Sequence, residues 1–115
     1  MFGIEELSVT DVAAKLEHGD DFILLDVREE DELKLANLGD KVVHLPMSIL
    51  AARQFDLIPA ALADKSKEVV VMCHHGGRSA QVAAFLKASG WQNVINMAGG
   101  IHQYALLVDR SIGVY

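Results

Sequence analysis

The sequence predicts an α/β domain of three layers built on a parallel, or nearly all parallel, β-sheet. Short apolar runs alternate along the chain with segments of helical spacing, which is the order expected of strand–helix–strand units. Two of these runs, residues 22–27 and 69–72, are apolar throughout except for Asp26, as expected for strands that are covered on both faces.

Length and composition fit a single domain over residues 1–115, because the chain is long enough for one hydrophobic core and too short for two. Hydrophobic residues make up 51% of the chain and charged residues 23%, which is typical of a globular protein. The formal net charge of −6 argues against a nucleic-acid partner, since phosphate backbones attract basic surfaces.

The sequence gives no sign of secretion or of a membrane partner. Residues 1–7 are acidic and do not resemble a signal peptide, and no apolar run approaches membrane-spanning length. The single cysteine excludes an internal disulfide and fits a reducing compartment. We therefore expect a soluble, cytoplasmic protein.

The first third of the chain predicts a strand, a helix and a second strand. Residues 5–9 are expected to form the first strand. Ser8 is placed to cap the following helix, with Asp11 three residues on, and Gly19 is placed to end it. The apolar run 22–27 then forms the second strand.

The middle of the chain predicts shorter elements. Residues 29–38 predict a short helix whose acidic start complements the helix dipole. Residues 42–46 predict a third strand, in which His44 is interpreted as a core or edge histidine with its hydrogen bonds satisfied. Residues 48–64 have helical spacing, and Pro59 within them indicates a break between two short helices.

The last third predicts two further strands, each followed by a helix. The valine-rich run ends at Cys73, and the helical pattern beyond it places Phe85 on the packed side and stops at Gly90. Residues 94–97 predict the fifth strand and residues 101–108 the closing helix.

Cys73 follows a predicted strand and precedes a predicted helix. In parallel α/β sheets ligands bind at the carboxyl ends of the strands, so Cys73 is expected at the position of a binding or active site. If residues 74–78 curl around the sulfur, their N–H groups form a nest for negative charge, and the next helix adds its positive end. Arg78 adds a positive charge, while Gly76 and Gly77 allow the backbone angles that a nest needs. These features favour the thiolate, which is the nucleophilic form of cysteine.

A lone cysteine is also compatible with inert packing, because free cysteine is among the residue types that are most often buried. The position of Cys73 at a strand end, before a loop with two glycines and an arginine, favours a functional thiol. We therefore interpret Cys73 as a nucleophile.

The segment 73–79, Cys-His-His-Gly-Gly-Arg-Ser, resembles the active-site loop of single-domain rhodanese-type sulfurtransferases. The resemblance continues in Leu-Leu-Asp-Val-Arg-Glu at residues 24–29 and in Gly-Gly-Ile at residues 99–101, so it covers essentially the whole chain. Two positions depart from the family pattern. Residues 35–39 lack the usual Gly-His-Ile motif. Tyr104 replaces the usual tryptophan, and we interpret it as a residue that packs the last helix onto the sheet.

The resemblance implies a rhodanese-like fold of about five strands with helices on both faces. It implies a thiosulfate:cyanide type of sulfurtransferase, in which the catalytic Cys73 accepts a sulfane sulfur and passes it from a persulfide to cyanide or a cellular thiol. The donor is expected to be thiosulfate or a persulfide, and a protein donor or acceptor also fits. No cofactor is implied. The loop that would bind substrate and cradle the persulfide consists of His74, His75, Gly76, Gly77, Arg78 and Ser79.

Individual roles within this scheme follow from the same resemblance. Arg78 is expected to orient the donor. Asp26 and Arg28 are expected to support the site by ordering its loops, with a purely structural ion pair as the alternative. His74 or His75 either assists donor binding and proton transfer or simply lines the entrance.

Three other interpretations were weighed. Adjacent residues such as His74 and His75 project in different directions, so no metal is expected beside Cys73. Four residues separate Cys73 from Arg78, one fewer than in the related phosphatases, which disfavours a Cys-based phosphatase or arsenate reductase. A partner-dependent persulfide carrier or a non-catalytic binding module stays open, because net acidity weakens the attraction of an anionic donor.

Overall fold

Residues 3–115, which are described by the computed structural model, form one five-stranded sheet with four α-helices. The strands lie in the order β1-β5-β4-β2-β3, and every neighbouring pair is parallel. The strands are β1 (Glu5–Leu7), β2 (Ile23–Asp26), β3 (Val43–His44), β4 (Glu68–Met72) and β5 (Asn93–Met97). The α-helices are α1 (Val9–His18), α2 (Met47–Arg53), α3 (Gly77–Ala88) and α4 (Gly100–Leu107). The predicted α/β architecture with a parallel sheet is confirmed.

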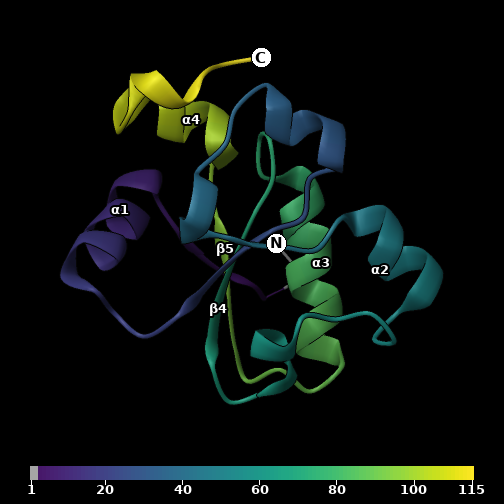
Figure 1. The fold of residues 1–115 in the computed structure, drawn as a ribbon. Helices are drawn as coiled ribbons and strands as arrows, with labels where there is room; N and C mark the ends of the chain where they lie inside the picture. Colours follow the sequence, from purple (N-terminus) through teal and green to yellow (C-terminus); the bar gives the residue numbers. More distant parts are fainter. Residues whose placement is uncertain (1–2) are drawn as a thin grey trace.

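Helices cover both faces of the sheet, as Figure 1 shows, with α1 and α4 on one side and α2 and α3 on the other. Strand β4 lies between β5 and β2 and is buried on both faces, since Val69 and Val71 pack under α2 and α3 while Val70 and Met72 pack under α1 and α4. The continuous apolar run in the sequence therefore reflects a central strand. Its carboxyl end leads directly into Cys73.

Local signals in the sequence set the boundaries of several elements. Ser8 caps α1 by accepting a hydrogen bond from the backbone of Asp11, and Gly19 ends the helix in the left-handed conformation, as predicted. The break expected near Pro59 is also present, because a 3₁₀ helix (Ala60–Ala63) follows that proline and is separate from α2. Tyr104 on α4 is buried in the core cluster on this face of the sheet, as expected.

Three expectations are wrong in detail. The first strand ends at Leu7 rather than at residue 9, because Ser8 caps α1 and Val9 is already helical. The helix predicted over residues 29–38 is a single 3₁₀ segment (Glu30–Lys34), and a physical reason lies in the contacts of Glu32. Its side chain accepts a hydrogen bond from the Glu29 backbone N–H and pairs with Arg78, and its carbonyl accepts from Leu35 at 3.0 Å in the tight 3₁₀ pattern, so tertiary contacts rather than helical spacing set this turn. Phe85 is 40% exposed rather than packed in the core, and it stacks on Phe55 at the edge of the buried stripe of α3.

Among residues 3–115, no helix is both long enough and apolar enough to span a bilayer. The first two residues of the acidic N-terminal stretch lie outside the described part of the chain.

Candidate active site

Cys73 lies at the junction between the central strand β4 and helix α3, and its side chain is buried. The Sγ atom accepts a hydrogen bond from the backbone N–H of Gly76 at 3.0 Å. Gly76 has a φ of +109°, a conformation that residues with a Cβ rarely adopt, and it immediately precedes the first residue of α3. The loop therefore turns back so that a backbone donor and the positive end of α3 both face the sulfur.

A buried polar chain continues from the sulfur through Ser79 to Asn96 on β5. The Cys73 thiol lies 3.3 Å from Ser79 Oγ, and the Ser79 hydroxyl donates to Asn96 Oδ1 at 2.6 Å. The Asn96 amide in turn donates to the carbonyl of Gly76 at 3.3 Å and to Glu6 at 2.8 Å. Asn96 thus binds the segment after Cys73 at two points, the Ser79 hydroxyl and the Gly76 carbonyl.

Asn96 was missed in the sequence, although one signal was present. It is a polar residue inside an otherwise apolar strand, and the structure buries it to 1% exposure. Buried amides are normally hydrogen-bonded to other buried polar groups, so such a residue marks a place where the fold positions something.

Arg78, the predicted donor-orienting residue, forms a two-pronged ion pair with Glu32. Its Nη1 and Nη2 atoms lie 2.7 and 2.8 Å from the two carboxylate oxygens. The hydrogen bonds from Arg78 lower the pKa of Glu32 to about 2, and the same contact raises the pKa of Arg78. Arg78 is therefore fixed in direction, and only its remaining N–H groups can meet a substrate.

Asp26 and Arg28 form an ion pair with fully buried side chains beside this arginine. Arg28 Nη2 lies 2.8 Å from the Asp26 carboxylate, which also accepts from the Arg28 backbone N–H at 3.1 Å. Arg28 Nη1 reaches the Tyr115 hydroxyl at 3.0 Å, and that hydroxyl donates to Glu32 at 3.0 Å. The pair is linked through Tyr115 and Glu32 to Arg78.

His44 on β3 completes this support, because its Nε2 atom lies 2.7 Å from the carbonyl of Arg28. Its interpretation as a satisfied edge histidine is confirmed. Nothing in the sequence singles out Tyr115 or Glu32, since each reaches the site only through the folding of distant segments.

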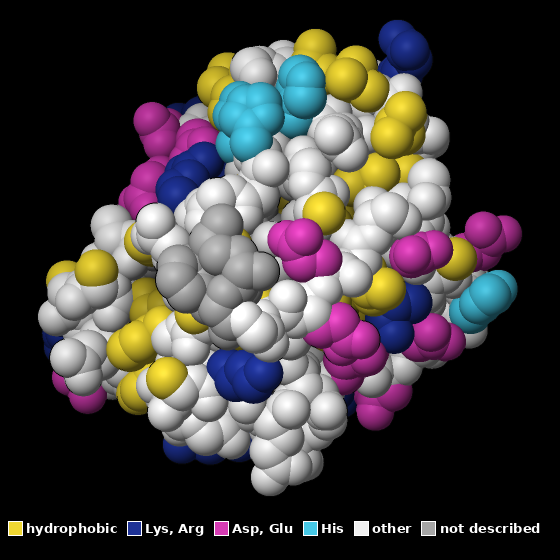
Figure 2. All heavy atoms as spheres, turned by 180° about the vertical axis from the view of Figure 1, so that it is seen from behind, with side chains coloured by type: hydrophobic (Ala, Val, Ile, Leu, Met, Phe, Trp, Pro, Cys, Tyr) yellow, Lys and Arg dark blue, Asp and Glu magenta, His cyan; other side chains and the backbone are white. Residues whose placement is uncertain are grey.

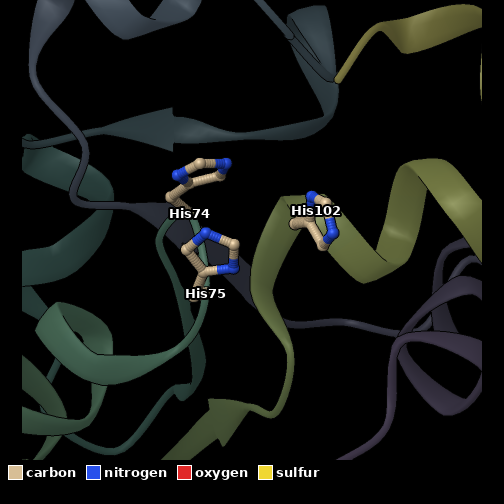
Figure 3. Close-up of side chains that lie close together, drawn as sticks. All are labelled: His74, His75 and His102. Atoms are coloured by element: carbon tan, nitrogen blue, oxygen red, sulfur yellow. The ribbon is translucent and has the colours of Figure 1, made fainter. Parts of the chain in front are cut away.

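The two histidines that follow Cys73 lie close to a third histidine from α4. Figure 3 shows the rings of His74, His75 and His102 close together, with the first two on the loop and the third on the helix. The His74 ring packs between Tyr115, with ring centroids 3.8 Å apart, and His75, at 3.9 Å. Burial, followed by the nearby His75, lowers the pKa of His74. Figure 2 shows histidine side chains gathered at one end of the molecular surface.

The Gly-Gly-Ile segment at the start of α4 closes the other side of the loop. The backbone N–H of Ile101 donates to the carbonyl of Cys73 at 2.9 Å, and that of His102 donates to the carbonyl of His74 at 3.0 Å. Gly100 has a φ of +63°, and a Cβ there would collide with the His74 carbonyl. The N-terminus of α4 therefore fixes the backbone on which the thiol stands.

Comparison with known proteins agrees with this architecture. A model of the rhodanese-like domain family matches residues 8–106. The chain is 36% identical over 119 residues to the rhodanese-like/PpiC domain-containing protein 12, chloroplastic, of Arabidopsis thaliana, covering 97% of this chain and 38% of that protein. It is 31% identical over 84 residues to the thiosulfate sulfurtransferase GlpE of Coxiella burnetii, covering 73% of this chain and 72% of that one. The crystal structure of a rhodanese-related protein from Thermoplasma volcanium superposes with a TM-score of 0.71 at 25% identity, covering 89% of this chain and 91% of that one.

Proposed function

The chain belongs to the rhodanese-like domain family, and we propose that it is a sulfurtransferase in which Cys73 carries the transferred sulfur as a persulfide. One observation carries the proposal: the Cys73 sulfur lies at the end of β4 and accepts a hydrogen bond from the Gly76 N–H at 3.0 Å. A backbone donor in this position stabilises negative charge on sulfur. The family match and the similarity to a thiosulfate sulfurtransferase support sulfur transfer as the class of reaction.

The proposed reaction has two displacement steps. Cys73 loses its proton to water, and the thiolate attacks the sulfane sulfur of a donor such as thiosulfate. The sulfur–sulfur bond of the donor breaks, sulfite leaves with the bonding electrons, and a persulfide remains on Cys73. An acceptor, cyanide or a cellular thiolate, then attacks the outer sulfur, and Cys73 leaves as the thiolate.

Residues of the loop support this chemistry in distinct ways. The N–H of Gly76 and the N-terminal end of α3 stabilise the anionic sulfur before and after transfer. Ser79 Oγ, 3.3 Å from the sulfur, accepts from the thiol and can turn to donate to the thiolate. Arg78 presents its free N–H groups toward the donor, and His74 and His75 line the entrance.

A phosphatase-like reaction is less well supported. Four residues separate Cys73 from Arg78, so the loop is smaller than that of the related phosphatases and fits a sulfur atom better than a phosphoryl group. Both terminal nitrogens of Arg78 are also occupied by Glu32, which leaves fewer donors for the oxygens of a phosphate.

A second function, a persulfide carrier that depends on a protein partner, is favoured by one observation. The positive charge of Arg78 is balanced by Glu32, and the chain carries a net charge of −6, so long-range attraction of free thiosulfate is weak. A carrier would take its sulfur from a partner that docks at the loop. In either case we propose residues 1–115 as one domain acting in the cytoplasm, where thiols stay reduced.

The mass of the intact protein after exposure to thiosulfate tests the proposal. We expect wild type to gain the mass of one sulfur atom and to lose it when cyanide is added, whereas Cys73→Ser should gain nothing. If wild type gains no sulfur from thiosulfate or from a small persulfide while Cys73 still reacts with an alkylating agent, sulfur transfer is wrong as the function.

A steady-state turnover assay with thiosulfate and cyanide separates the enzyme from the carrier. A free-standing enzyme turns over thiosulfate and cyanide repeatedly at a steady rate. A carrier forms the persulfide from a persulfide donor but turns over thiosulfate and cyanide only feebly.

A further inference from the structure

A cluster of three histidines from two separate elements lies beside Cys73. His74 and His75 belong to the loop after β4, and His102 lies in the first turn of α4 (Figure 3). Their candidate ligand nitrogens all lie within 4.8 Å of one another. The adjacency of the first two argued against a metal site, but the helix supplies the third ligand from another direction.

Two nitrogens of this cluster are buried and lack a hydrogen-bond partner among the residues that the structure describes. They are Nε2 of His74 and Nδ1 of His102. Buried polar nitrogens are normally paired, and an unpaired one often marks the place of a bound ion or water. Two such atoms in one cluster of three rings point to a shared ligand.

Two of the three residues, His74 and His102, are also held in place before any ligand binds. The backbone N–H of His102 donates to the backbone carbonyl of His74 at 3.0 Å, so a hydrogen bond links the two backbones that carry these rings. Stacking on Tyr115 fixes the plane of the His74 ring, at an angle of 5° between the two rings. His75 is exposed and is therefore free to turn toward the other two.

We propose that His74, His75 and His102 form a binding site for a divalent transition metal of the zinc class, with water in the fourth position. Three imidazoles with an open position are an established donor set for Zn²⁺, whereas Ca²⁺ and Mg²⁺ require oxygen ligands. Zinc–nitrogen bonds of about 2.0–2.1 Å place tetrahedral ligand atoms roughly 3.4 Å apart. The present spacing of up to 4.8 Å must therefore shorten when the metal binds, and the exposed His75 side chain is the one with room to move.

This site is distinct from the thiol. Cys73 is 1% exposed, and its sulfur faces Gly76 and Ser79 rather than the histidine rings. The metal would link the Cys73 loop to α4 from outside, so its binding should stabilise the folded protein. The inference concerns metal binding alone and stands whether or not sulfur transfer is the reaction.

Titration of the untagged protein with Zn²⁺, followed by calorimetry, tests the proposal, and the absorption spectrum with Co²⁺ reports the ligands. We expect one metal ion per chain in wild type and in Cys73→Ser, which lacks the only thiol. His102→Ala should weaken binding at least about tenfold, since even an outer-shell partner is worth that much. His18→Ala, which removes an exposed histidine elsewhere, is the matched control and should bind as wild type does.

Thermal unfolding provides a second readout. Zn²⁺ should raise the melting temperature of wild type, Cys73→Ser and His18→Ala, and should leave that of His102→Ala unchanged. Because His75 is exposed, His75→Ala should fold normally. If His102→Ala does not fold, the Zn²⁺ affinity of His75→Ala tests the site instead. Unchanged Zn²⁺ affinity in His75→Ala, or loss of binding in Cys73→Ser, would overturn the proposal.

Discussion

Arg78, on the first turn of α3, donates from both terminal nitrogens to the carboxylate of Glu32, at 2.7 and 2.8 Å. The pair joins the Cys73 loop to the 3₁₀ helix that follows β2. Tyr115 donates to the same carboxylate and accepts from Arg28, so the loop is connected to the buried Asp26–Arg28 pair. The Arg78–Glu32 ion pair and the buried amide of Asn96 thus both restrain the segment after Cys73.

Replacing Arg78 should slow sulfur uptake without unfolding the protein. In Arg78→Ala the loop loses a fixed positive charge beside the thiol, and we expect the rate of persulfide formation from thiosulfate to fall at least about tenfold. Arg110→Ala removes an exposed arginine from the C-terminal segment and serves as the matched control. Equal rates in Arg78→Ala and in the control would show that Arg78 has no part in handling the donor.

The ion pair should make stability depend on pH in the acidic range. The pKa of Glu32 is about 2 in the folded protein and 4.5 ordinarily, so the folded state binds its proton more weakly. The pair therefore stabilises the fold above pH 4.5, and this contribution is lost as the pH falls toward 2. With solvent screening at the partly exposed Arg78, we expect the contribution to be on the order of 2 kcal/mol.

Urea unfolding of wild type and Glu32→Gln across this pH range measures the effect. The difference in unfolding free energy should be largest near neutrality and should shrink as the pH approaches 2. Glu30→Gln, an exposed acid in the same 3₁₀ helix, should follow wild type throughout. A constant difference between wild type and Glu32→Gln at all pH values would contradict the assignment.

Asn96 should contribute to both stability and sulfur transfer. Asn96→Ala removes the nearer acceptor of the buried Ser79 hydroxyl, at 2.6 Å, and leaves it only the Gly76 carbonyl at 3.2 Å. We expect a loss of about 1–3 kcal/mol in unfolding free energy. Persulfide formation should also slow, because Ser79 and the Gly76 carbonyl are no longer held. Asn93→Ala, at an exposed position of the same strand, is the control for both measurements. Wild-type stability and rate in Asn96→Ala would leave this residue without a role.

Features encoded by neighbouring residues could be predicted from the sequence. The cap of α1 at Ser8, the break near Pro59 and the central strand before Cys73 each depend on a few adjacent residues. The helix expected at residues 29–38 is only a 3₁₀ segment, in which Glu32 is held by Arg78 and Tyr115, and contacts with such distant residues leave no mark on the periodicity.

The partners of the loop could not be predicted in the same way. Glu32, Asn96 and His102 lie far from residues 73–79 in the sequence. They contact this segment only because the carboxyl ends of the parallel strands lie at one edge of the sheet. Glu32 is one of several acids in its segment, and nothing in the sequence distinguishes it from Glu30 or Asp31. The position of Cys73 at the end of a central strand could be predicted because neighbouring residues encode it, whereas the distant residues around the loop could not.

Gly100 offers a test of how strictly α4 fixes the loop. A Cβ at this position would lie 2.6 Å from the Cys73 carbonyl oxygen and would collide with the carbonyl of His74, at a φ of +63°. Gly39 has nearly the same φ, +65°, but nothing lies within 4 Å of a Cβ there. Gly39→Ala should therefore cost only the backbone strain, about 1–2 kcal/mol, and should leave persulfide formation unchanged. Gly100→Ala should cost a further 1–3 kcal/mol or so from steric overlap and should slow persulfide formation, because the loop must move to relieve the collision. Equal losses of stability in the two variants, measured by urea unfolding, would mean that α4 does not constrain the loop.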